Sequence, residues 1–197
     1  MSSIKYGTDD DPYSYKGTDI LINKLDIRTN IILEKAEEEI STLAANSIDF
    51  SGLPFDANYW KSIHKLLFTD LYSWAGEFRT VNITKGSTIF CNPLYIDNEL
   101  NKLFNNFNNM SSFSELSHSD LIQHVSEFYI ELNLIHPFRE GNGRSQRILF
   151  DHILANCGYS LEWNKITKDI WLQANICGVE LNYKPMEDII SKCLKEF

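Results

Sequence analysis

Apolar residues recur every three or four positions along most of the chain, the spacing that places them on one face of an α-helix. Capping residues and helix-breaking Gly and Pro divide this pattern into segments. The segments predict helices over residues 18–25, 29–43, 56–76, 93–107, 120–134, 144–156, 167–176 and 185–195, with an extended stretch over 159–163. The chain is therefore expected to fold as an all-α domain.

Three of these helices bear on function. In the helix over 29–43 the apolar face consists of Ile32, Ala36, Ile40 and Leu43. Its glutamates are expected mostly on the solvent-exposed side: Glu34, Glu37, Glu38 and Glu39. The helix over 56–76 has a capping residue, Asp56, and is expected to end at Gly76. The helix over 120–134, capped by Ser117 or Ser119, is apolar on more than one face, which predicts a central, surrounded helix.

One segment alternates with the period of a β-strand instead. Apolar and polar residues alternate over 80–84, Lys85-Gly86-Ser87 is typical of a turn, and Thr88-Ile89-Phe90 is suited to a second strand. This pattern predicts a β-hairpin. A lone two-stranded ribbon is marginally stable in water, so it must pack on the helices. Its open edge is suited to receive an extended segment of another protein, although a surface hairpin without a partner fits the sequence equally well.

Composition narrows the possibilities further. At 197 residues and 43% hydrophobic, without a linker-like segment, the chain is expected to form a single domain over residues 1–197, with an N-terminal arm over 1–17. The net charge of −9 argues against a nucleic-acid-binding surface. No signal region or membrane-length apolar run is present, so we expect a cytoplasmic protein that contacts neither membrane nor nucleic acid directly. Four widely spaced cysteines indicate neither a zinc site nor a disulfide framework.

The richest stretch for chemistry is residues 136–147. Pro137 disfavours helical angles in the residue before it, so His136 should end the central helix with its ring turned into a loop. With a reference pKa near 6.5, this ring is suited to accept a proton from a hydroxyl. A Gly141-Asn142-Gly143 turn followed by a helix directs backbone N–H groups at one point, where a phosphate would bind.

Three charged side chains surround that point. Arg144 and Arg147 share a helix face near the helix N-terminus, where cations are disfavoured unless they meet an anion. Glu140 is suited to hold Mg²⁺ together with phosphate oxygens. Taken singly, the glycine turn, the paired arginines and the histidine are each common in proteins without such a site. The other histidines are interpreted as packed or exposed residues without a catalytic role: His64, His118, His124 and His152.

Taken in order, residues 136–147 match every fixed position of the signature His-x-Phe-x-(Asp/Glu)-Gly-Asn-Gly-Arg-x-x-Arg. The chain therefore resembles the Fic family, whose other characteristic segments are similar to residues 15–19, 23–25, 74–80 and the hairpin at 85–90. The resemblance implies a Fic-type helical domain whose hairpin over 80–90 is a flap beside the active site. It also marks residues 136–147 as the catalytic loop and the start of the following helix.

The resemblance implies protein adenylyltransferase activity, in which a hydroxyl of a target protein attacks the α-phosphorus of ATP. His136 would be the base and Glu140 the magnesium ligand, while Phe138 would be structural. Asn142 and the backbones of Gly141 and Gly143 would hold the α- and β-phosphates, and Arg144 and Arg147 the outer phosphates. The target would dock on the flap residues Lys85, Gly86, Ser87, Thr88, Ile89 and Phe90; the last two either clamp a target side chain or face the core.

Self-restrained family members carry a (Ser/Thr)-x-x-x-Glu-(Gly/Asn) helix whose glutamate would pair with Arg144 here, and this chain has no match to it. The resemblance therefore implies a toxin restrained by a small separate antitoxin that contacts Arg144. Similar compact relatives suggest a type II topoisomerase subunit, such as one of gyrase, as the target. Two alternatives stay open: a Doc-like phosphotransferase, whose loop lacks the Gly143-Arg144 pair found here, and a non-catalytic, nucleotide-dependent binding module.

Overall fold

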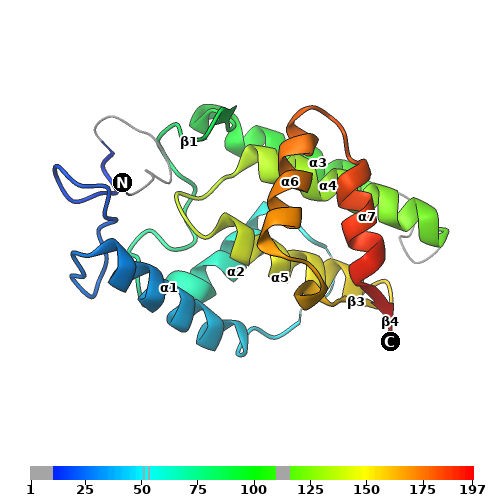
Figure 1. The fold of residues 1–197 in the computed structure, drawn as a ribbon, viewed down its shortest axis with the longest axis horizontal. Helices are drawn as coiled ribbons and strands as arrows, with labels where there is room; N and C mark the ends of the chain where they lie inside the picture. Colours follow the sequence, from blue (N-terminus) through cyan, green and yellow to red (C-terminus); the bar gives the residue numbers. More distant parts are fainter. Residues whose placement is uncertain (1–10, 51, 53, 110–115) are drawn as a thin grey trace.

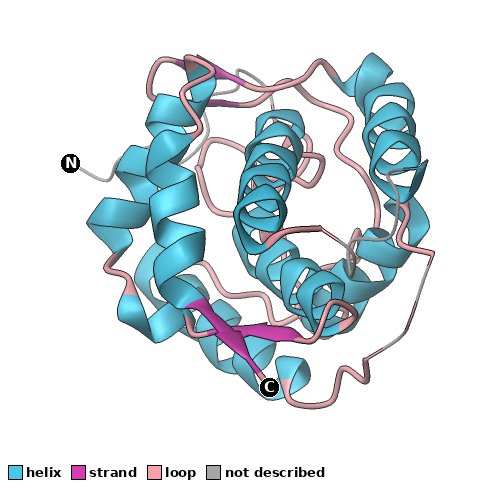
Figure 2. Ribbon diagram, turned by 90° about the vertical axis from the view of Figure 1, so that its right-hand side faces the viewer, coloured by secondary structure: helices cyan, strands magenta, loops and turns pink. Residues whose placement is uncertain are grey.

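The fold consists mainly of helices packed on one another, as Figures 1 and 2 show. The described residues also form two small, two-stranded β-sheets. The computed structural model describes residues 11–50, 52, 54–109 and 116–197. In that part of the chain the α-helices are α1 (Asn30–Ala45), α2 (Ala57–Phe68), α3 (Ile96–Asn109), α4 (His118–Ile135), α5 (Asn142–Ala155), α6 (Lys168–Val179) and α7 (Lys184–Cys193). Short 3₁₀ turns at Pro93–Tyr95 and Trp163–Lys165 precede α3 and α6. The predicted all-α class is confirmed.

Capping residues set the start of several helices where the sequence predicted them. The Asp56 side chain accepts a hydrogen bond from the Tyr59 N–H (2.7 Å), and Ser117 and Thr167 cap α4 and α6 in the same way. Pro185 lies in the first turn of α7, where the helix needs no N–H donor. Local side-chain chemistry therefore determines where these helices begin.

The core is organised around α4, which contacts α3, α5, α6 and α7. Its buried residues lie on several faces and include Val125, Ile130 and Leu132, each without exposed surface. The prediction of a central, surrounded helix is confirmed. Helix α2 packs against both α1 and α5. None of the helices in the described part of the chain is long and apolar enough to cross a membrane.

The strands form two separate antiparallel pairs. The predicted hairpin exists but is short: β1 (Thr84–Lys85) pairs with β2 (Thr88–Ile89) across a Gly86-Ser87 turn. A second pair joins β3 (Tyr159–Leu161) to β4 (Leu194–Glu196), with Ser160 opposite Lys195. The sequence predicted the extended stretch of β3 but placed residues 194 and 195 in the last helix. The predicted end of the last helix was wrong, since α7 ends at Cys193 and the chain continues as strand β4.

The expected short helix over residues 18–25 is not formed. This segment is a loop in which Ser14 and Leu21 make an isolated antiparallel bridge. The Asn23 side chain donates to the carbonyls of Leu21 and Ile27 and accepts the Ile27 N–H at 2.9 Å. Asparagine thus supplies local hydrogen bonds that compete with those of a helix.

The helix expected to run to Gly76 ends eight residues earlier. The last residue of α2 is Phe68, whose carbonyl then accepts from both Leu71 and Tyr72 and so turns the chain. Gly76 adopts a left-handed conformation (φ 84°) in the following loop rather than at the helix end. A Cβ there would lie 2.8 Å from the Lys65 Cβ, so the close approach of this loop to α2 requires glycine.

The inward face of α1 differs from the predicted one. Leu33, Glu37 and Ser41 are the buried residues, whereas Ile32 and Leu43 are 56% and 70% exposed. The predicted apolar face was therefore wrong for Ile32 and Leu43, whereas Ala36 and Ile40 are half-buried as expected. Placing Glu37 on the solvent side was also wrong. Polar groups face inward on this helix because they meet a charged side chain of α5.

Candidate active site

His136 ends α4 and is held in one orientation. Its backbone is left-handed (φ 48°, ψ 62°), so the helix stops and the chain turns into Pro137. The ring stacks on Phe90, with centroids 4.0 Å apart and planes 17° apart. Its Nδ1 lies 3.1 Å from the carbonyl oxygen of Asn133 and must donate to it. This fixes the tautomer and leaves the lone pair on Nε2, the arrangement of a base.

The surroundings of His136 keep the ring neutral. Burial lowers its pKa to about 3, against opposing contributions from the Asn133 carbonyl and Glu140. Lys85 of the flap and Arg79 add to the lowering of the pKa, because a positive charge disfavours the imidazolium form. The ring is therefore neutral at pH 7, the form that can accept a proton.

The loop after His136 is closed by Asn142. The Asn142 Oδ1 accepts the Phe138 N–H at 2.8 Å, and its Nδ2 donates to the Phe138 carbonyl at 2.7 Å. Phe138 is fully buried and stacks on His64, with ring centroids 3.9 Å apart. Phe138 therefore anchors the loop, and the Asn142 amide acts within the loop and shapes the site from there.

The start of α5 has the features of an anion site. No side chain caps this helix end in the described part of the chain, so the first-turn N–H groups lack a helical acceptor. Gly141 precedes the helix in a left-handed conformation (φ 82°), and a Cβ there would lie 2.3 Å from the Phe68 ring. Gly143 is exposed, with no atom within 4 Å of the position of a Cβ. These N–H groups and the helix dipole favour a phosphate.

Glu140 is buried, and hydrogen bonds fix both its carboxylate and its backbone carbonyl. Its Oε1 accepts the Gly141 N–H at 2.9 Å, while its carbonyl oxygen lies 2.9 Å from the His64 Nε2. His64 is fully buried, accepts the Gly76 N–H at Nδ1, and therefore donates from Nε2. Burial lowers the pKa of His64 to about 4, which keeps the ring neutral and this bridge intact. His64 is thus packed, as the sequence suggested, but it also fixes the backbone of Glu140.

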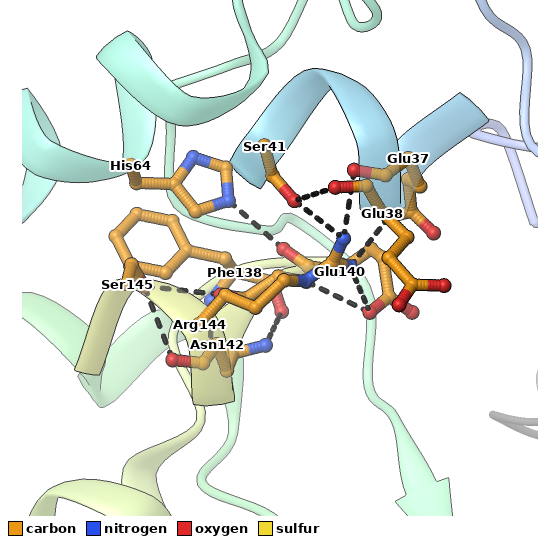
Figure 3. Close-up of polar contacts among 10 residues, drawn as sticks. Glu37, Glu38, Ser41, His64, Phe138, Glu140, Asn142, Arg144 and Ser145 are labelled. Carbon is orange, nitrogen blue, oxygen red and sulfur yellow. Dashed lines mark hydrogen bonds and ion pairs between the residues drawn. The ribbon is translucent and has the colours of Figure 1, made fainter. Parts of the chain in front are cut away.

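Arg144 points away from the helix start and toward α1, as Figure 3 shows. Its Nη2 lies 2.7 Å from Glu37 Oε1 and 3.4 Å from Glu140 Oε1, and its Nη1 donates to Ser41 Oγ at 3.3 Å. The guanidinium also lies over the Phe68 ring at 4.7 Å. Although burial opposes it, Glu37 and Glu140 raise the pKa of Arg144. Although the chain has no match to the inhibitory-helix motif, two of its own glutamates therefore contact Arg144.

The second arginine has different surroundings. Arg147 is exposed, and its guanidinium lies 5.7 Å from the centroid of the Trp171 ring on α6. Within the described residues no ion pair involves Arg147. The structure therefore does not gather the two arginines: Arg144 is bound to α1, and Arg147 remains at the surface.

The flap presents two hydrophobic residues in opposite directions. Phe90 is 7% exposed and lies against His136, whereas Ile89 is 78% exposed. Phe90 therefore supports the His136 ring, and Ile89 is exposed to solvent. Lys85, Gly86 and Ser87 at the turn are exposed as well.

A buried ion pair between the N-terminal arm and the loop had no signal in the sequence. The Arg139 Nε lies 3.0 Å from Asp11 Oδ2, and the two side chains are 6% and 8% exposed. In the sequence Asp11 is one of three consecutive aspartates in this arm, and nothing near it indicates a partner. The two residues are 128 positions apart, so no local sequence pattern predicts this ion pair.

Comparison with known proteins agrees with this geometry. The family model described as Fic/DOC family matches residues 54–154. The chain is 36% identical to the "Probable protein adenylyltransferase Fic" of Escherichia coli, over 98% of this chain and 97% of that protein, and 34% identical, with the same coverage, to the Salmonella typhimurium protein of that name. The crystal structure of BepC from Bartonella tribocorum with bound AMPPNP superposes with a TM-score of 0.85 at 26% identity, covering 94% of this chain and 97% of BepC. The chain belongs to the Fic/DOC family.

Proposed function

We propose that this chain, a protein adenylyltransferase by its family and relatives, transfers AMP from ATP to a hydroxyl side chain of a target protein. The observation that carries the proposal is His136: a buried, neutral ring with its lone pair on Nε2, stacked on Phe90 of the flap and followed by a helix start whose N–H groups are suited to an anion. The intact Gly143-Arg144 pair favours AMP transfer over the Doc-like alternative.

In the proposed reaction His136 Nε2 accepts the proton of the target hydroxyl. The hydroxyl oxygen forms a bond to the α-phosphorus, and the bond from that phosphorus to the oxygen bridging to the β-phosphate breaks, so that pyrophosphate leaves. The negative charge of bound ATP raises the pKa of His136 from its low value and so strengthens the base. General-base help of this kind is worth about 10²–10⁴ in rate.

The N-terminal turn of α5 is the proposed binding site of the α- and β-phosphates. Backbone N–H groups of Asn142, Gly143 and Arg144 supply donors there, and the Asn142 side chain holds the loop that presents them. Arg147 is the outer-phosphate ligand that the structure leaves exposed. Arg144 can bind an outer phosphate only if its ion pair with Glu37 breaks first. AMPPNP bound to BepC supports an adenine nucleotide as the ligand of this fold.

Glu140 is the proposed magnesium ligand. Mg²⁺ usually takes one or two protein carboxylates and completes its shell with phosphate oxygens and water, and a buried carboxylate beside the anion site fits that requirement. The described residues contain no group of three or more potential metal ligands, so phosphate oxygens would supply most of the shell. The bound ion would neutralise charge on the phosphates.

The proposal also includes a cellular role as a toxin. It rests on the family resemblance and envisages a small antitoxin at Arg144 and a type II topoisomerase subunit as the target. Because Glu37 already contacts Arg144, an antitoxin glutamate would have to replace it there. Labelling a bacterial lysate with α-labelled ATP and identifying the modified polypeptide tests the target directly.

The central experiment compares His136→Ala with His124→Ala, a matched change at a partly exposed histidine on the same helix. Only His136→Ala should abolish transfer of label from α-labelled ATP, while AMPPNP binding remains. Label from γ-labelled ATP would instead indicate a phosphotransferase. Equal activity of His136→Ala and wild type would support the binding-module alternative.

A further inference from the structure

Arg79 is the largest charged side chain in the core and has no role in the reaction as proposed so far. It is 2% exposed, and it lies in segment 74–80, which is similar to a characteristic segment of the Fic family. A buried charge is costly unless hydrogen bonds compensate it, so the partners of Arg79 indicate what it does.

Those partners belong to two parts of the site. The Arg79 Nε donates to the carbonyl of His136 at 2.8 Å, and its Nη2 donates to that of Ile135 at 3.1 Å. The same guanidinium donates to Val81, before β1, at 2.7 Å and to Cys91, after β2, at 2.5 Å. One planar group thus connects both ends of the flap to the base residue.

Backbone contacts reinforce this connection. The Arg79 N–H donates to the Pro137 carbonyl at 2.9 Å, and the Cys91 N–H donates to the Leu134 carbonyl at 3.2 Å. The guanidinium lies at the C-terminus of α4, where unpaired carbonyls and the helix dipole favour a cation. Lysine cannot reproduce these contacts, because its ammonium lacks a rigid fork of five donors.

We infer that Arg79 is a positioning residue that fixes the flap and the His136 backbone as one rigid unit, so that a target docked on the flap meets the base in line. The inference rests on the proposed function for its catalytic consequence. Its structural part, that the flap and the end of α4 loosen together without Arg79, is independent of any target.

The test uses Arg79→Lys in the full chain, with Arg139→Lys as the matched control. Arg139 is a second buried arginine, three residues beyond His136, but it is hydrogen-bonded to Asp11. Hydrogen exchange is measured for peptides covering residues 81–91 and 134–138, at a temperature where both variants are folded. In Arg79→Lys both peptides should exchange about tenfold faster, whereas Arg139→Lys should leave the 81–91 peptide unchanged.

Activity and binding complete the test. Per folded molecule, Arg79→Lys should lose at least about 100-fold in AMP transfer from α-labelled ATP to lysate proteins, while its affinity for AMPPNP stays within about threefold of wild type. Unchanged exchange in either peptide, or wild-type transfer by the folded variant, overturns the inference. If wild type itself transfers no label, the proposed function fails, and the exchange data still decide whether Arg79 couples the two segments.

Discussion

The contact between Glu37 and Arg144 leads to a prediction about nucleotide affinity. Arg144 cannot bind a phosphate while its Nη2 is 2.7 Å from the Glu37 carboxylate, so ATP and Glu37 compete for the same guanidinium. Glu37→Gln removes the negative charge but keeps an acceptor of the same shape. The variant should therefore bind nucleotide more tightly and transfer AMP faster at subsaturating ATP.

The magnitude follows from the kind of hydrogen bond that is weakened. A bond to a charged group contributes about 1.5–3 kcal/mol and a neutral one about 0.5–1.5, a difference of about 1 kcal/mol. The Arg144 side chain is 29% exposed, so solvent screening keeps the effect at the lower end. About 1 kcal/mol corresponds to roughly a fivefold lower Kd.

Titration calorimetry with AMPPNP measures this change. Glu38→Gln is the matched control, since Glu38 is the next residue of the same helix and has an exposed side chain. It removes the same charge without touching Arg144 and should leave the Kd unchanged. If Glu37→Gln binds AMPPNP no better than Glu38→Gln, Arg144 does not leave Glu37 on nucleotide binding, and the competition argument is refuted.

Three further predictions use other contacts. His64 and His136 have folded pKa values below the unfolded value of 6.5, so the unfolded state binds more protons below that pH and stability falls as pH drops. Between pH 7 and 5, each of these two histidines should remove roughly 2 kcal/mol from the free energy of unfolding. Denaturant titrations at both pH values measure this loss, and an unchanged free energy would contradict it. Gly141→Ala should destabilise by about 1–3 kcal/mol, because its Cβ would overlap the Phe68 ring at a positive φ, whereas Gly143→Ala should be nearly neutral for stability; similar denaturation midpoints for the two would be inconsistent with this packing. Glu140→Ala should sharply raise the magnesium concentration needed for half-maximal transfer, and an unaltered Mg²⁺ titration would remove Glu140 from the metal role.

Local chemistry made much of the structure predictable. Asp56, Ser117, Thr167 and Pro185 mark helix starts through contacts within a few residues, and the pattern of α4 indicates a helix surrounded by others. The order of residues 136–147 alone predicted a glycine turn followed by a helix start suited to a phosphate, and the turn and the helix start are present in the structure. Each of these features depends on neighbours in the sequence.

The features that were missed depend on distant partners. Glu37 faces inward because it accepts a hydrogen bond from Arg144, 107 positions later, so helical periodicity placed Glu37 on the wrong side of α1. Strand β4 forms only because β3 lies beside it, and Arg79 gains its role from carbonyls of α4. In each case a tertiary contact overrides the local pattern. Such a contact cannot be predicted from the periodicity of a single sequence.

The pairing of Asp11 with Arg139 has a consequence for the order of folding. The loop that carries the base is anchored by a residue near the start of the chain, 128 positions away, and closing so long a segment costs entropy that only late contacts repay. We expect the helices to assemble first and the arm to dock last. The enzyme would then become competent only in the final step of folding, which keeps a partly folded chain from modifying other proteins.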